Sequence, residues 1–71
     1  SDVKKIKILD ELSAPDGPLK LLALEQKLYL YVKINDHENI KSQVDLILSD
    51  QGITPEQVTR IKDVESVYEL N

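Results

Sequence analysis

Apolar residues at the start of the chain recur every three or four positions, which is the spacing of one face of an α-helix. These positions are Val3, Ile6, Leu9 and Leu12. Ser1 or Asp2 can cap the first turn. Residues 5 to 8 also alternate between lysine and isoleucine, as a strand would. We favour a helix that reaches about residue 14, because the helical spacing continues to Leu12 without a strand-ending signal.

The segment 15 to 18, of sequence Pro-Asp-Gly-Pro, predicts a turn and a boundary. A second helix is expected from Leu19. Its apolar face holds Leu21, Leu24 and Leu28. From residue 28 to residue 34 the apolar residues occupy every second position, which is the period of a half-buried strand. A helix that continues to about Lys33 is equally compatible with this segment, and both interpretations stay open.

Two further helices are expected in the second half of the chain. Asp36 is a suitable N-cap for the first of them, and Gly52 is expected to stop it. Its apolar positions are Ile40, Val44, Ile47 and Leu48. Thr54 and Gln57 then have the spacing of a capping box, with Pro55 at the first helical position, which predicts a short helix from 55 to about 62. Residues 64 to 70 suit either an edge strand or a continued helix.

Length and composition favour one small helical domain with an aliphatic core. The chain has 71 residues, of which 41% are apolar, and it contains no Phe, Trp or Met. We expect a mainly α monomer of three to four helices over residues 1–71. The expected core residues are Leu9, Leu12, Leu24, Leu28, Ile40, Val44, Ile47 and Ile61. A domain of this size has little room to enclose a substrate, so an enzyme is not expected.

Several classes of protein are excluded by what the sequence lacks. The chain has no cysteine, which excludes a disulfide-stapled mini-protein and a cysteine-based zinc site. Its apolar runs are too short to cross a bilayer, and it starts without Met or a signal segment. We therefore expect a soluble piece of a larger intracellular protein, located in the cytoplasm or nucleus.

Candidate chemistry is sparse. The single histidine, His37, stands in a polar turn without further His or Cys ligands, and no phosphate-binding loop is present. We expect no catalytic residue, no cofactor and no metal. The net charge of −4 is divided unevenly, with +1 in residues 1–34 and −5 in residues 35–71. An acidic half disfavours binding to the phosphates of nucleic acid.

One segment has the pattern of a helix-turn-helix. The apolar residues and turn glycine of that motif correspond to Ile47, Gly52, Ile53, Val58 and Ile61. Leu48 stands where the motif has a small residue, and Gln51 where it has an apolar one. These departures make a plain pair of packed helices as good an interpretation as a DNA reader.

The order of the parts resembles a winged-helix domain. Residues 8–12 look like its first helix, residues 15–19 like the strand before the second helix, residues 40–53 like the third helix and its exit, and residues 67–70 like a strand of the wing. Among winged helices the chain is similar to the C-terminal domains of replication proteins, namely the minichromosome maintenance helicase and the middle subunit of replication protein A. The likeness implies a role in DNA replication, with DNA binding as the default.

Two features depart from the winged-helix pattern, namely the strand-like residues 28–34 and the capping box at Thr54. They leave room for an α/β alternative. In it, residues 27–34 form a strand and residues 37–52 a helix, which resembles the first half of an ACT regulatory domain. That family implies a small-molecule sensor, but its Pro-Gly pair at the helix start is replaced here by His37-Glu38-Asn39.

Weighing charge against fold, we expect a non-catalytic protein-interaction or regulatory module of a larger protein that replicates or processes nucleic acid. Tyr29 and Tyr31 are the candidate protein interface, because aromatic anchors dominate interface energetics. The alternative is an auxiliary DNA contact through Lys4, Lys5 and Lys7. A protein partner is expected, together with weak or absent binding of duplex DNA.

Overall fold

The computed structural model describes residues 1–12 and 19–68, except for the side chain of Leu12. It contains four α-helices: α1 (Asp2–Leu12), α2 (Lys20–Lys33), α3 (His37–Leu48) and α4 (Pro55–Tyr68). No strand occurs within the described residues. The prediction of a mainly α domain is therefore confirmed.

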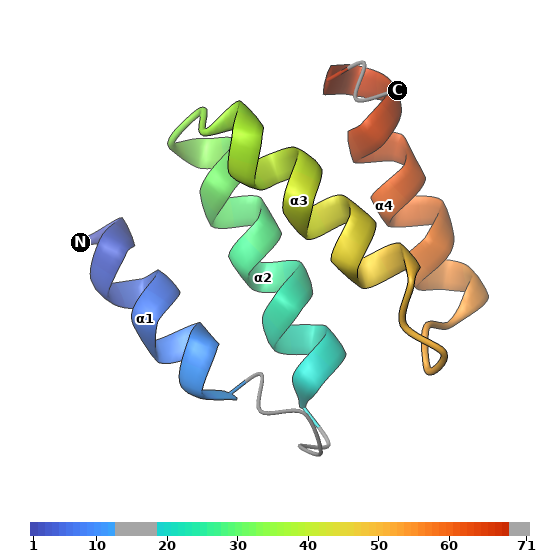
Figure 1. Ribbon diagram of the computed structural model, residues 1–71, viewed down its shortest axis with the longest axis horizontal. Coiled ribbons are helices and arrows are strands. Elements are labelled where there is room, and N and C mark those ends of the chain that lie inside the picture. Colours follow the sequence, from blue (N-terminus) through green and yellow to red (C-terminus); the bar gives the residue numbers. More distant parts are fainter. Residues whose placement is uncertain (13–18, 69–71) are drawn as a thin grey trace.

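The helices follow one another across the molecule in chain order and alternate in direction (Figure 1). Each helix packs against the next one along the chain. The result is a slab with extents of 29 × 29 × 15 Å. Because α1 stands at one edge of this slab, it has a neighbour on one side, α2.

The core lies between α2, α3 and α4. Its fully or almost fully buried members are Leu24, Leu28, Ile40, Val44, Ile47 and Ile61. All six were expected in the core. Leu9 is half-buried instead, and the side chain of Leu12 lies outside the described part of the chain. Gln43 is also buried, and its amide donates a hydrogen bond to the backbone oxygen of Leu24 at 3.0 Å, which satisfies the polar group in this apolar setting.

The strand interpretation of residues 28–34 is wrong, and the ACT-like α/β alternative fails with it, because residues 27–33 belong to α2. Burial follows the helical period: Leu24 and Leu28 are in the core, and Tyr31 and Val32 pack against it one turn later. Ile34, which the strand would have buried, is 41% exposed. Packing along one helical face therefore decided between the two periods.

The turn between α2 and α3 is closed by local hydrogen bonds. Asn35 has a left-handed backbone, with φ of 59°. The amide of Asn35 donates to the Val32 oxygen at 3.1 Å, and the amide of Asp36 donates to the Tyr31 oxygen at 3.0 Å, which is the Schellman pattern. The Asp36 side chain accepts from the amide of Asn39 at 3.2 Å, so its predicted role as the N-cap of α3 is confirmed.

The end of α3 differs from expectation. The helix stops at Leu48, before Gly52, and Gly52 has no left-handed backbone. Asp50 organises the turn instead, since its carboxylate accepts from the amide of Gly52 at 2.8 Å and pairs with the ammonium of Lys20 at 2.8 Å.

The capping box at the start of α4 is confirmed. The amide of Thr54 donates to Gln57 Oε1 at 3.0 Å, and the amide of Gln57 donates to Thr54 Oγ1 at 3.2 Å. The helix then runs past the predicted end near residue 62, because Val64 and Tyr68 continue the face that packs against the core. The predicted wing strand is wrong at Val67 and Tyr68, which are helical, while residues 69 and 70 lie outside the described part. Of the strand expected at residues 15–19, residues 15–18 lie outside it as well, and Leu19 is in a turn, not a strand.

Candidate interaction groove

An open groove of about 480 Å³ runs between α1 and α2, and its walls are mainly apolar. The residues that line it are Lys5, Ile8, Leu9, Gln26, Tyr29, Leu30 and Lys33. Two of these, Lys5 and Tyr29, were among the candidate site residues from the sequence.

The groove results from the way α1 is attached. On α1 the lining positions are spaced i, i+3 and i+4, and on α2 they are spaced i, i+3, i+4 and i+7. Each helix therefore contributes one continuous stripe of side chains, and the stripes lie side by side. Ile8 is 50% exposed, so the apolar surface of the groove is open to solvent.

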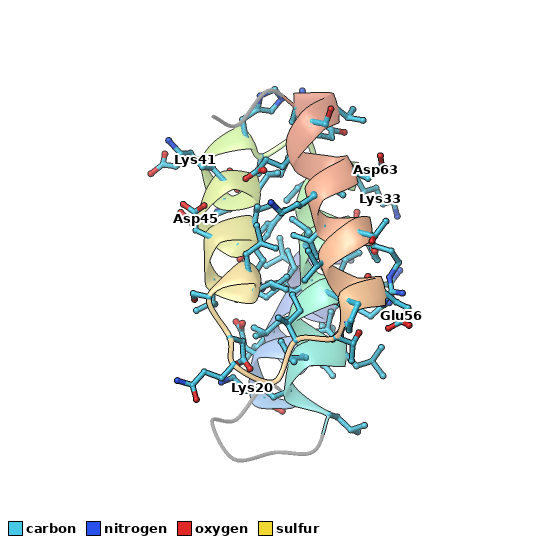
Figure 2. The ribbon with its side chains drawn as sticks, turned by 90° about the vertical axis from the view of Figure 1, so that its right-hand side faces the viewer. Lys20, Lys33, Lys41, Asp45, Glu56 and Asp63 are labelled. Atoms are coloured by element: carbon cyan, nitrogen blue, oxygen red, sulfur yellow. The ribbon has the colours of Figure 1, made fainter. Side chains whose placement is uncertain are left out.

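Two lysines stand at one end of the groove. The ammonium group of Lys33 lies 3.2 Å from Asp2 Oδ1, and that of Lys5 lies 3.9 Å from the same oxygen. One carboxylate thus faces two ammonium groups, which leaves this end of the groove positively charged. Lys33 projects from the body of the helices into solvent (Figure 2).

Tyr29 is hydrogen-bonded to a buried carboxylate. Its hydroxyl donates to Glu25, whose side chain is 3% exposed. On α4 the Arg60 guanidinium binds the same carboxylate in a bidentate manner, with Nε 2.6 Å from Oε2 and Nη2 2.9 Å from Oε1. A wall of the groove is therefore connected to α4 through Glu25.

This cluster changes the acidity of its members. The hydrogen bond from the Arg60 guanidinium lowers the pKa of Glu25 below its ordinary value of 4.5, even though burial acts in the opposite direction. Burial raises the pKa of Tyr29, and the adjacent Glu25 carboxylate raises it further. At neutral pH the cluster is a carboxylate, a guanidinium and a neutral phenol.

Glu25 and Arg60 were not recognised as partners from the sequence. The one sequence signal is that Glu25 stands between Leu24 and Leu28, on the face that the helix period buries. An acidic residue in that position requires a buried partner, but nothing in the sequence places Arg60 beside it.

The other candidate residues lie elsewhere. Tyr31 packs partly against the core, with the Lys27 ammonium 5.6 Å from its ring centroid. The two tyrosines therefore do not form one anchor surface, as residues two apart on a helix point in different directions. Lys4 and Lys7 are exposed on α1 and do not line the groove.

An ion pair between Lys27 and Asp10 ties α1 to α2. Burial is the largest single influence on the pKa of Lys27 and acts to lower it, but the hydrogen bonds and coulombic interactions with Asp10 and Tyr31 together outweigh burial and raise the pKa. Lys27 is therefore a cation at neutral pH, and its ion pair with Asp10 joins the two helices that form the groove.

The described residues hold no group of three or more side chains suited to a metal ion, and no helix among them is long and apolar enough to cross a membrane. His37 contacts Asn35 Oδ1 through Nε2 at 2.8 Å, and its ring meets that of Tyr68 edge-on. No protein-family model, curated protein or solved structure matches this chain.

Proposed function

We propose that this domain is a non-catalytic protein-interaction module and that it binds a partner protein through the groove between α1 and α2. The observation that supports the proposal is the open apolar groove with an aromatic wall, Tyr29, and two lysines at one end. Interfaces combine apolar area that excludes water with charged groups at the rim, and this surface offers both.

Charge supports a protein partner over DNA. On α3, Glu38 and Asp45 oppose Lys41, and on α4 the cation Arg60 is bound by Glu25. The exposed acids Asp45 and Asp63 belong to the helices that a helix-turn-helix would place against DNA, and Figure 2 shows them on the surface of α3 and α4. Phosphate binding there would bring like charges together.

A helix-turn-helix role for α3 and α4, with an auxiliary DNA contact through Lys4, Lys5 and Lys7, is the second proposal. It rests on the order helix, turn, helix and on the exposed lysines of α1. A parent protein that replicates or processes nucleic acid, and an intracellular location, stay predictions under both proposals.

Chemical-shift titrations of the ¹⁵N-labelled domain separate the two proposals. Peptides selected from a random library for binding to the domain should perturb amides around Ile8, Tyr29 and Leu30. Ile8→Asp should abolish this binding, while Val3→Asp, on the same helix but 75% exposed and outside the groove, should not. Sub-micromolar binding of duplex DNA at near-physiological salt, with shifts centred on α3 or α4, would contradict the first proposal.

A further inference from the structure

The shape of the groove limits what can fill it. Its α2 wall runs from Gln26 to Lys33, which corresponds to about 10 Å along the helix axis. Two parallel stripes of side chains with a gap between them are the surface that a third helix needs for ridge-into-groove packing. About two turns of such a helix would fit along this length.

The polarity of the walls favours a helical occupant over an extended one. The backbone amides and carbonyls of the two walls are hydrogen-bonded within α1 and α2, so they are not free to pair with a peptide backbone. The hydroxyl of Tyr29 is likewise already bonded to Glu25. Gln26 and the two end lysines are the remaining polar side chains of the lining. An extended peptide would leave backbone amides and carbonyls against apolar walls without partners, whereas a helix satisfies its own backbone.

The charge at the end of the groove selects the partner further. Asp2 neutralises one of the two ammonium groups of Lys5 and Lys33, and the second is left for an incoming anion. Both lysine side chains are more than half exposed, so they can turn toward a ligand. An acidic side chain at this end would be attracted, and a basic one repelled.

We infer that the partner segment is an amphipathic α-helix of about two turns in contact, with apolar residues at i, i+3 and i+7 facing the groove and an acidic residue beside Lys5 and Lys33. This inference rests on the proposed function, because it specifies the partner of the same groove. It specifies the chemistry of the contact and does not identify the parent protein.

The test uses four synthetic peptides of equal length. The first has three leucines at helical spacing and a glutamate at one end. In the second the leucines are redistributed around the helix, in the third the glutamate is replaced by lysine, and in the fourth a central proline prevents helix formation. The first should bind with shifts confined to the groove, and the other three should bind at least about tenfold more weakly.

Protein variants then test the two elements of recognition. Ile8→Asp should weaken the first peptide by at least about tenfold, with Val3→Asp as the control. The double variant Lys5→Glu/Lys33→Glu should reverse the preference, so that the lysine peptide binds better than the glutamate peptide. Lys41→Glu, an exposed position on α3, should not change the preference. Circular dichroism of each variant establishes that it is folded.

The outcomes distinguish this inference from the proposed function. If the proline peptide, the redistributed peptide or the lysine peptide binds the groove as well as the first, the inference is wrong and the groove is still a protein site. If sedimentation shows a dimer that Ile8→Asp dissociates, the occupant is a second copy and the inference is overturned. If no peptide, including library-selected ones, perturbs the groove, the proposed function fails as well.

Discussion

At the scale of single residues, Glu25 links two helices that are far apart in the sequence, α2 and α4. Its side chain is almost fully buried. Its carboxylate accepts hydrogen bonds from the hydroxyl of Tyr29 on the same helix and from the guanidinium of Arg60 on α4. Removing one member of such a cluster leaves the others short of partners, which is more harmful than the loss of an ordinary surface pair.

The Glu25 and Arg60 pair predicts a specific pH dependence. The pKa of Glu25 is lower in the folded chain than its ordinary 4.5, so the pair contributes its full stability above about pH 4.5 and loses it as the pH falls through the lowered pKa. Arg60→Gln should lower the urea midpoint at pH 7. Without the guanidinium, burial raises the pKa of Glu25, so the variant protonates this side chain at a higher pH than the wild type does. The difference in urea midpoint between the variant and the wild type should therefore become smaller from pH 7 toward pH 4.

The control for this experiment is Lys62→Gln, an exposed position on the same helix, which should leave the urea midpoint and its pH profile unchanged. If the difference in urea midpoint between wild type and Arg60→Gln is constant from pH 7 to pH 4, the ionisation of Glu25 is not coupled to Arg60 and the prediction is wrong.

Asn35 offers a second residue-scale prediction. Its φ of 59° is sterically unfavourable for residues with a Cβ and carries no steric penalty for glycine. Asn35→Gly and Asn35→Ala both remove the contact with His37, so their difference reports on the backbone alone. The alanine variant should be less stable than the glycine variant by about 1 kcal/mol in urea unfolding. Equal stability would mean that the turn adopts another conformation in the variants.

At the scale of helices, α1 differs from the other three because none of its described side chains belongs to the buried cluster. Among the described side chains of α1, none is buried, and Leu9 and Ile6 are half-buried. Its ion pairs with α2, from Asp10 to Lys27 and from Asp2 to Lys33, involve partly exposed side chains, and exposed pairs contribute little. Few buried contacts leave a helix able to detach locally.

Hydrogen exchange should therefore distinguish α1 from the other helices. We expect amides in the middle of α1 to exchange about tenfold or more faster than those around Val44 in α3, because local opening of α1 leaves the core intact. Native-state exchange measured by NMR as a function of urea provides the comparison. If α1 and α3 exchange with the same free energy of opening, α1 is part of the cooperative core.

At the scale of the whole molecule, three helices supply the core and a fourth widens the slab. The buried cluster draws its members from α2, α3 and α4. A domain of 71 residues has a small margin of stability, so each of these side chains carries a large share of it. Because α1 lies at one edge, it forms the groove with α2, while the core stays between α2, α3 and α4.

Val44→Ala tests the dependence on this core. Val44 is 0% exposed, and the substitution should cost about 1 to 3 kcal/mol in thermal or urea unfolding. For a domain of this size each kcal/mol corresponds to a shift of roughly 4 to 8 °C in Tm. Leu46→Ala on the same helix is the matched control, since Leu46 is 50% exposed and should cost less. An unchanged Tm for Val44→Ala would contradict the packing described above.

Local signals determined the starts of α3 and α4, which could be predicted from the sequence by itself. The caps at Asp36 and Thr54 use side chains within three residues of their targets, so a short stretch of sequence contains all the information they need. The six core residues were predictable for a similar reason, because the helical period marks the face that must leave water.

Tertiary structure decided what depends on contacts between distant residues. The segment from Leu28 to Lys33 fits two periods, and only packing against α3 and α4 favours the helix; the same packing extends α4 to Tyr68. Glu25 meets Arg60 across 35 positions of sequence. The groove likewise needs α1 and α2 side by side, so Lys5 and Tyr29 could be chosen as candidates from the sequence, but their meeting on one surface could not. A side chain's neighbours across the fold are set by how the helices stack, and no local pattern encodes that stacking.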